Sequence, residues 1–84
     1  MNRTYRKRAE SRFAVCIKNK DYAAALELGK VYQVVADEAA AKLRQIRVID
    51  ESGEDYLYPR QYFVPVRLPE SAGRAIRRAA SVRA

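Results

Sequence analysis

The stretch YPRQYFVPV, residues 58–66, decides the fold. Pro59 ends a strand, because proline has no N–H group to donate to a neighbouring strand. Residues 60–62 suit a single tight turn, and residues 63–66 form a short strand in which Pro65 requires an edge position. The stretch therefore predicts two strands joined by one helical turn, with the second strand at the edge of a sheet.

The strand that leads into this stretch belongs to a hairpin. Residues 44–50, RQIRVID, alternate in character, with Ile46 and Val48 on one side. Alternation with a period of two is typical of a half-buried strand. Residues 51–54, ESGE, form a turn, and residues 55–58, DYLY, return as the next strand.

Two more strands lie nearer the N-terminus. Residues 12–18, RFAVCIK, alternate, and Cys16 is expected to be a small packed residue. Residues 19–30 form a long first loop with one helical turn, and residues 31–36, VYQVVA, are rich in strand formers. Residues 37–43 form a connection that is too short to be a stable helix alone.

Five short strands predict a mainly β protein, folded as a small five-stranded barrel over residues 13–66. Closing the sheet would remove the exposed edges of so small a protein. Residues 1–12 form a basic N-terminal arm. Residues 67–84 form a basic C-terminal tail that can be helical from Ser71, although Gly73 weakens that helix.

Three segments carry a resemblance to a known group of proteins: GKVYQVVADE, IRVIDESGEDYLYPRQYF and the YPRQYFVPV stretch. They resemble small SH3-like β-barrel proteins of uncharacterised function from bacteria and phages. The resemblance covers about residues 13–66 and implies an SH3-like barrel, but it implies no activity. Signalling SH3 domains bind Pro-rich peptides with a tryptophan and an acidic first loop. This chain has no tryptophan, and its first loop has Lys20 and Lys30 beside Asp21 and Glu27.

The charge is unevenly distributed. The chain carries a net charge of +7, yet residues 13–66 carry −1 while residues 1–12 and residues 67–84 each carry +4. Basic segments of this kind either solubilise a protein or capture nucleic acid and acidic protein surfaces. The candidate basic-arm residues are Arg3, Arg6, Lys7, Arg8, Arg74, Arg77 and Arg78.

Several classes of protein are disfavoured. The chain has one cysteine, Cys16, and no histidine, so it forms no internal disulfide, no Cys/His zinc cluster and no Ser–His or Cys–His catalytic pair. It has no glycine-rich phosphate loop and no apolar run of roughly 20 residues. We therefore expect a cytoplasmic protein that is not an enzyme, with no cofactor, no metal and no membrane contact.

The acidic residues around the predicted hairpin turn allow two interpretations. Asp50, Glu51, Glu54 and Asp55 cluster there. They form either a solvated turn or a weak divalent-cation or acid/base site.

The tyrosines also allow two interpretations. Tyr56 and Tyr58 share a face of their strand, and Tyr62 follows closely. They either fill the core and its rim or form an aromatic face that stacks on a peptide or an unpaired base, with Arg60 and Arg47 beside them.

Two functions remain open. The sequence favours a non-enzymatic binding module for nucleic acid or nucleoprotein, because arginine makes bidentate contacts with phosphate. The alternative is a protein–protein adaptor or regulatory subunit with no nucleic-acid contact. In either case we expect a monomer or a weak homo-oligomer.

Overall fold

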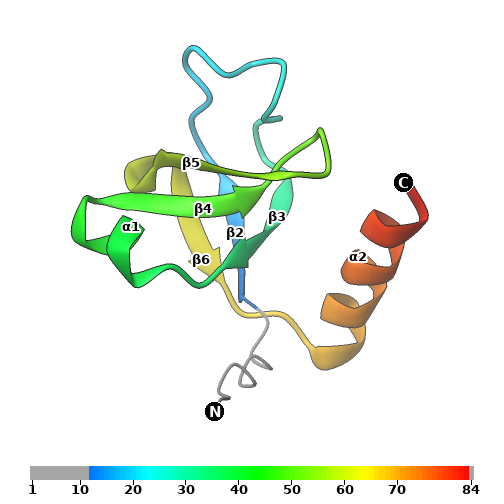
Figure 1. Cartoon of the computed structure of the whole chain (residues 1–84). Coiled ribbons are helices and arrows are strands. Elements are labelled where there is room, and N and C mark those ends of the chain that lie inside the picture. Colours follow the sequence, from blue (N-terminus) through cyan, green and yellow to red (C-terminus); the bar gives the residue numbers. More distant parts are fainter. Residues whose placement is uncertain (1–11, 84) are drawn as a thin grey trace.

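The computed structural model describes residues 12–83 of the 84-residue chain (Figure 1). The predicted basic residues Arg3, Arg6, Lys7 and Arg8 lie outside the described residues. The elements are, in order, β2 (Arg12–Cys16), β3 (Val31–Val35), α1 (Glu38–Lys42), β4 (Gln45–Ile49), β5 (Asp55–Pro59), the 3-10 helix η2 (Arg60–Tyr62), β6 (Phe63–Val66) and α2 (Glu70–Arg83).

The five strands form one antiparallel sheet in the order β5-β4-β3-β2-β6, so the prediction of a mainly β protein is confirmed. The sheet is not closed into a barrel, because the end strands β5 and β6 are joined by η2 without pairing to each other. Figure 1 shows β4 and β5 crossing over β2 and β6, so the sheet is folded on itself around one face.

The edge position predicted for Pro65 is confirmed. Val64 lies opposite Val15 in the β2–β6 pair, and the Ile17 N–H donates to the Tyr62 carbonyl over 2.8 Å. Hydrogen-bonded pairs alternate along an antiparallel ladder, so Val64 faces β2 and Pro65 presents its backbone to the free edge. This edge therefore lacks a donor at Pro65, which protects it from pairing with another strand.

The folded face of the sheet encloses the core. Small residues of the central strand β2 make room there for large neighbours: Ala14, 1% exposed, lies opposite Tyr32, and Cys16, 0% exposed, lies opposite Phe63. The rings of Tyr32 and Phe63 meet edge to face, with centroids 6.3 Å apart. The rest of the core cluster comprises Leu26, Val48, Tyr58 and Tyr62.

The other face of the sheet is covered only in part. Phe13 alternates with Ala14 and so points to this face, where it is 5% exposed. Gly73 of α2 lies over it, so close that an added Cβ would approach the Phe13 ring to 3.2 Å. The helix predicted for the tail is confirmed, and its glycine permits this contact. Ile17, on the same side of the chain, remains 55% exposed.

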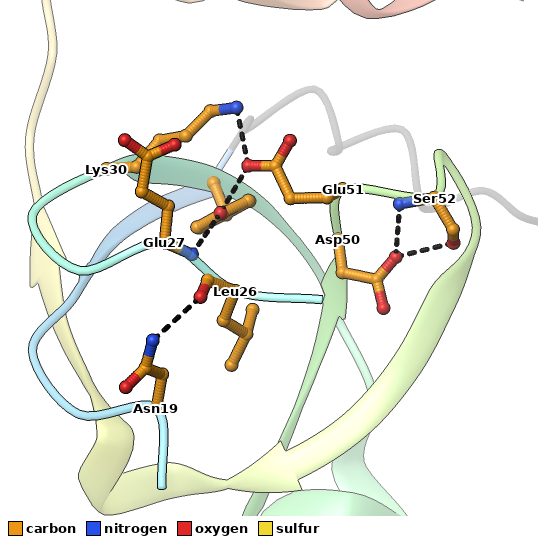
Figure 2. A network of polar contacts seen from close by, with 8 residues as sticks. Asn19, Leu26, Glu27, Lys30, Asp50, Glu51 and Ser52 are labelled. Atoms are coloured by element: carbon orange, nitrogen blue, oxygen red, sulfur yellow. Dashed lines mark hydrogen bonds and ion pairs between the residues drawn. The ribbon is translucent and has the colours of Figure 1, made fainter. Parts of the chain in front are cut away.

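The long loop between β2 and β3 is held by polar contacts (Figure 2). Asn19 donates from Nδ2 to the Leu26 carbonyl over 2.9 Å, which closes the loop on itself. The Tyr32 hydroxyl accepts from the Glu27 N–H at 2.8 Å and donates to Glu51 Oε2 at 2.5 Å. The loop is therefore tied both to its own ends and to the hairpin turn.

Two carboxylates of the predicted acidic turn serve as structural hydrogen-bond acceptors. Glu51 accepts from Lys30 Nζ at 2.6 Å, and Asp50 accepts from the Ser52 N–H at 2.8 Å (Figure 2). Asp50 also accepts from the Tyr58 hydroxyl at 2.5 Å. Burial raises the pKa of Asp50, but the hydrogen bonds from Ser52 and Tyr58 outweigh it and hold that pKa below its usual value. Within residues 12–83, no group of three or more Asp, Glu, Cys or His side chains is arranged to hold a metal.

Candidate functional site

The predicted aromatic face is mostly inside the protein. Tyr58 is 4% and Tyr62 is 7% exposed, and Tyr22 from the long loop packs against both, with ring centroids 4.9 Å and 6.0 Å away. Tyr56 is 49% exposed, and its hydroxyl donates to Glu54 over 3.0 Å. Of the three predicted tyrosines, Tyr56 alone is therefore half-exposed.

Arg47, which the sequence grouped with these tyrosines, points to the other face. It lies opposite Leu57 in the β4–β5 pair, and Leu57 points to the face opposite to that of its neighbours Tyr56 and Tyr58. Its guanidinium is held by two carboxylates, with Nε 2.8 Å from Asp37 and Nη1 3.1 Å from Asp55. The structure does not bring Arg47 together with the tyrosines.

Asp37 is itself fixed by the fold, because it is the N-cap of α1. Its Oδ1 accepts from the Ala40 N–H over 3.0 Å. This hydrogen bond, and then the one from Arg47, hold the pKa of Asp37 below its usual value. Arg47 therefore connects α1 to β4 and β5, with its charge offset by Asp37 and Asp55.

A concave surface lies at one end of the sheet, where β2 begins, β3 and β6 end and β4 begins. It comprises an open groove of about 1190 Å³ and a smaller hollow of about 620 Å³ beside η2, which share Ile46, Arg60 and Pro65 in their lining. Among the described residues its charged lining comprises six arginines and two carboxylates: Arg12, Arg44, Arg47, Arg60, Arg67, Arg77, Asp37 and Glu70. We call this surface the arginine groove.

Two of these arginines lie opposite each other along the backbone, just beyond the last pair of the β4–β5 ladder. Gln45 lies opposite Pro59, and the Arg60 N–H donates to the Arg44 carbonyl over 3.0 Å, which continues the β4–β5 register by one step. Arg44 and Arg60 are therefore directly opposite, and both are exposed. Two exposed positive charges therefore start from adjacent backbone positions.

A second pair has the same arrangement. Phe13 lies opposite Val66 in the last pair of the β2–β6 ladder, and Arg12 and Arg67 are the residues that adjoin this pair. Both arginines are exposed and line the groove. Across the described chain, no ion pair joins a carboxylate to Arg12, Arg44, Arg60 or Arg67.

Arg44 also has an unusual backbone conformation. It follows the C-cap residue Leu43 of α1 and has a φ of 59°. Glycine is the usual residue at this position, because a side chain costs about 1–2 kcal/mol in the left-handed region. Arg44 therefore occupies a position at which glycine would avoid this cost.

Helix α2 adds charge at the rim of the groove. Gly73 and Arg77 line the groove, and Arg74 lies close by on the same side of the helix, paired with Glu70 at 3.1 Å. Arg78 is exposed. Of the tail residues predicted from the sequence, the structure thus places Arg77 in the groove and the other two on the same helix.

The opposite end of the sheet carries the opposite charge. Residues 17–30 and 50–55 hold six carboxylates and three lysines. The near-neutral net charge of the folded part therefore results from opposite charges at its two ends, with arginines at one end and carboxylates at the other. The net charge summed over residues 13–66 did not show this arrangement. Extending the predicted hairpin by one residue pair would have placed Arg44 opposite Arg60 and so indicated part of the basic end.

Comparisons with known proteins found no match: no protein-family model, no curated protein and no solved structure is significantly similar to this chain. None of the helices in the described part of the chain is both long and apolar enough to cross a bilayer.

Proposed function

We propose that this protein is a nucleic-acid-binding module that holds phosphate groups in the arginine groove. The observation that carries the proposal is the pair of exposed arginines at adjacent backbone positions, Arg44 and Arg60. Two like charges side by side lower the stability of the free protein, and a bound anion between them removes that cost. Guanidinium groups suit phosphate because their planar N–H groups make two hydrogen bonds at once.

A chain of phosphates fits the groove better than a single anion does. The second pair, Arg12 and Arg67, lies on β2 and beyond β6, whereas Arg44 and Arg60 lie at the ends of β4 and β5. The cationic groups thus spread over both ends of the strand order β5-β4-β3-β2-β6. A polyanion can meet separate cationic points with successive phosphates, and it gains affinity from the counterions that it releases.

The fold proposed to carry this site is SH3-like. Its support is the order of the antiparallel strands, the long loop between the first two of them, and the single 3-10 turn Arg60–Tyr62 between the last two. The resemblance of the YPRQYFVPV stretch points the same way. The relation to small bacterial and phage proteins of this fold is part of the same proposal.

The test is binding of the full chain to a short nucleic acid over a salt series. Arg44→Gln/Arg60→Gln should weaken binding about tenfold or more at low salt, and it should reduce the slope of log affinity against log salt by about 1 for each phosphate that the variant no longer binds. The matched control is Lys18→Gln/Lys20→Gln, which removes the same charge from the opposite end. It should change affinity far less.

Two results would contradict the proposal. In the first, the wild-type chain does not bind nucleic acid even at low salt. In the second, the two double variants weaken binding equally, which would show that net charge alone matters and that the groove has no special part. Circular dichroism of each variant checks that the sheet is retained, so a loss of folding cannot be mistaken for a loss of binding.

A protein–protein adaptor remains the second candidate, and one observation favours it. Val64 and Ile17, at the β6 edge of the sheet, are 44% and 55% exposed. Apolar side chains gathered at an edge are typical of contact surfaces. If the protein is an adaptor that uses this edge, the double variant Val64→Ser/Ile17→Ser should no longer bind its partner. The double variant Arg44→Gln/Arg60→Gln should still bind it, which is the reverse of the result expected for nucleic acid.

A further inference from the structure

Within residues 12–83, the arginine groove offers no exposed ring on which a base could stack. Its aromatic lining residues in the described part of the chain are Phe13 and Phe63, and each is only 5% exposed. The exposed rings, Tyr22 and Tyr56, do not line the groove, and Tyr56 is hydrogen-bonded toward the acidic turn through Glu54. Proteins that hold single strands without sequence preference combine a cationic groove with aromatic side chains that stack on successive bases. This groove has the first feature without the second.

The groove also has little that could distinguish one base from another. Among the described residues its polar lining consists of six arginines, two carboxylates and the two amides of Gln45 and Gln61. Asp37, which could accept from a base, is already occupied by Ala40 and Arg47. Among the described residues, the lining arginines that form no ion pair with a carboxylate are Arg12, Arg44, Arg60 and Arg67, all of them suited to phosphate.

We propose that the partner in the arginine groove is double-stranded nucleic acid, bound through its phosphate backbone and without regard to base sequence. This inference rests on the proposed function and specifies the class of nucleic acid. A duplex carries one charge for about every 1.7 Å of its length, roughly twice the density of one strand, and its bases are shielded by stacking. A site built from arginines without stacking rings gains most from that density.

The experiment compares a short duplex with a single strand that has the same number of phosphates. Fluorescence anisotropy with the full chain gives both affinities across a salt series from about 50 to 200 mM. The duplex should bind about tenfold tighter or more at each salt concentration, because stacking does not compensate the single strand for its lower charge density. Duplexes of unrelated sequence should agree within about threefold, since phosphate contacts carry no sequence information.

Tyr56→Ala supplies the control for stacking. Its ring is exposed, and its hydroxyl contacts only Glu54 among the hydrogen bonds of the described chain, so the variant should fold. Affinities for both the duplex and the single strand should be unchanged, because the ring lies outside the groove. A loss of single-strand affinity in this variant would show a stacking surface and overturn the inference.

The remaining outcomes separate this inference from the proposed function. If the single strand binds as tightly as the duplex or tighter, with the same dependence on Arg44 and Arg60, the inference is wrong and the proposed function stands. If duplexes of different sequence differ more than about tenfold, direct contact with bases is shown and the inference is again wrong. If neither nucleic acid binds, the proposed function itself falls.

Discussion

Arg44→Gly should stabilise the protein while it weakens binding. Arg44 holds a φ of 59°, where a side chain costs about 1–2 kcal/mol that glycine does not incur. Glycine loses more backbone entropy on folding, and this loss lowers the free energy of unfolding by about 0.5–1 kcal/mol. Removing one charge from the pair with Arg60 adds about 0.2–1 kcal/mol. The free energy of unfolding should therefore rise by about 1 kcal/mol.

Thermal unfolding followed by circular dichroism measures this effect. For a domain of this size, about 1 kcal/mol raises Tm by roughly 4–8 °C. Arg44→Gln separates the two causes, because it removes the charge and keeps the side chain at positive φ; it should raise Tm by less than Arg44→Gly. Both variants should bind nucleic acid more weakly to a similar degree.

The reasoning is refuted if Arg44→Gly leaves Tm unchanged or lowers it. That result would mean that the backbone at Arg44 is not strained, or that the arginine side chain contributes stabilising contacts of its own. A variant that is more stable and still binds with full affinity would show that Arg44 is not kept for binding.

Three further predictions concern the core. Tyr58→Phe should lower stability by about 1.5–3 kcal/mol, because it removes a hydrogen bond to the charged Asp50. Since that bond helps hold the pKa of Asp50 below its unfolded value, stability should fall as the pH drops below about 5, and urea titrations should show a shallower fall in the variant. Gly73→Ala should lower Tm despite the better helix propensity of alanine, because its Cβ would meet the buried Phe13 ring at 3.2 Å. Cys16 is fully buried, and burial raises the pKa of its thiol, so a maleimide should label it only as fast as the protein opens; rapid labelling in the folded state would place the thiol at the surface.

Local patterns in the sequence were enough to predict the strands. Alternation over residues 12–18 and 44–50, and the two prolines of the YPRQYFVPV stretch, reflect constraints that act within a few residues. They predicted the five strands, the η2 turn and the edge position of Pro65. The short helix α1 was expected to be a mere connection, but Asp37 caps it and Arg47 ties it to the sheet. The cap joins Asp37 to Ala40 within one turn and is a local signal, whereas the ion pair with Arg47 needs β4 to fold back beside α1.

The predicted site was harder to obtain from the sequence, because it depends on which strands lie side by side. Tyr56 and Tyr58 share a face of β5, but the fold of the sheet over the core buries Tyr58 and leaves Tyr56 half-exposed. Side chains alternate between the two faces of β4, and this alternation places Arg47 on the face opposite to that of Tyr56 and Tyr58. Arg12 and Arg67 are assigned to opposite ends of the chain by sequence, and only the β2–β6 register brings them together. Neighbouring charges of this kind become visible once strand partners are known.

The central claim is that the arginine end of the sheet is the binding surface. Titrating the isotope-labelled full chain with a short duplex and following backbone amide resonances tests it directly. We expect the shifts to concentrate at Arg12, Arg44, Arg60 and Arg67, while residues 19–30 and the turn at residues 50–54 remain unchanged. Shifts centred on the turn or on Tyr56, or none at low salt, would contradict the account.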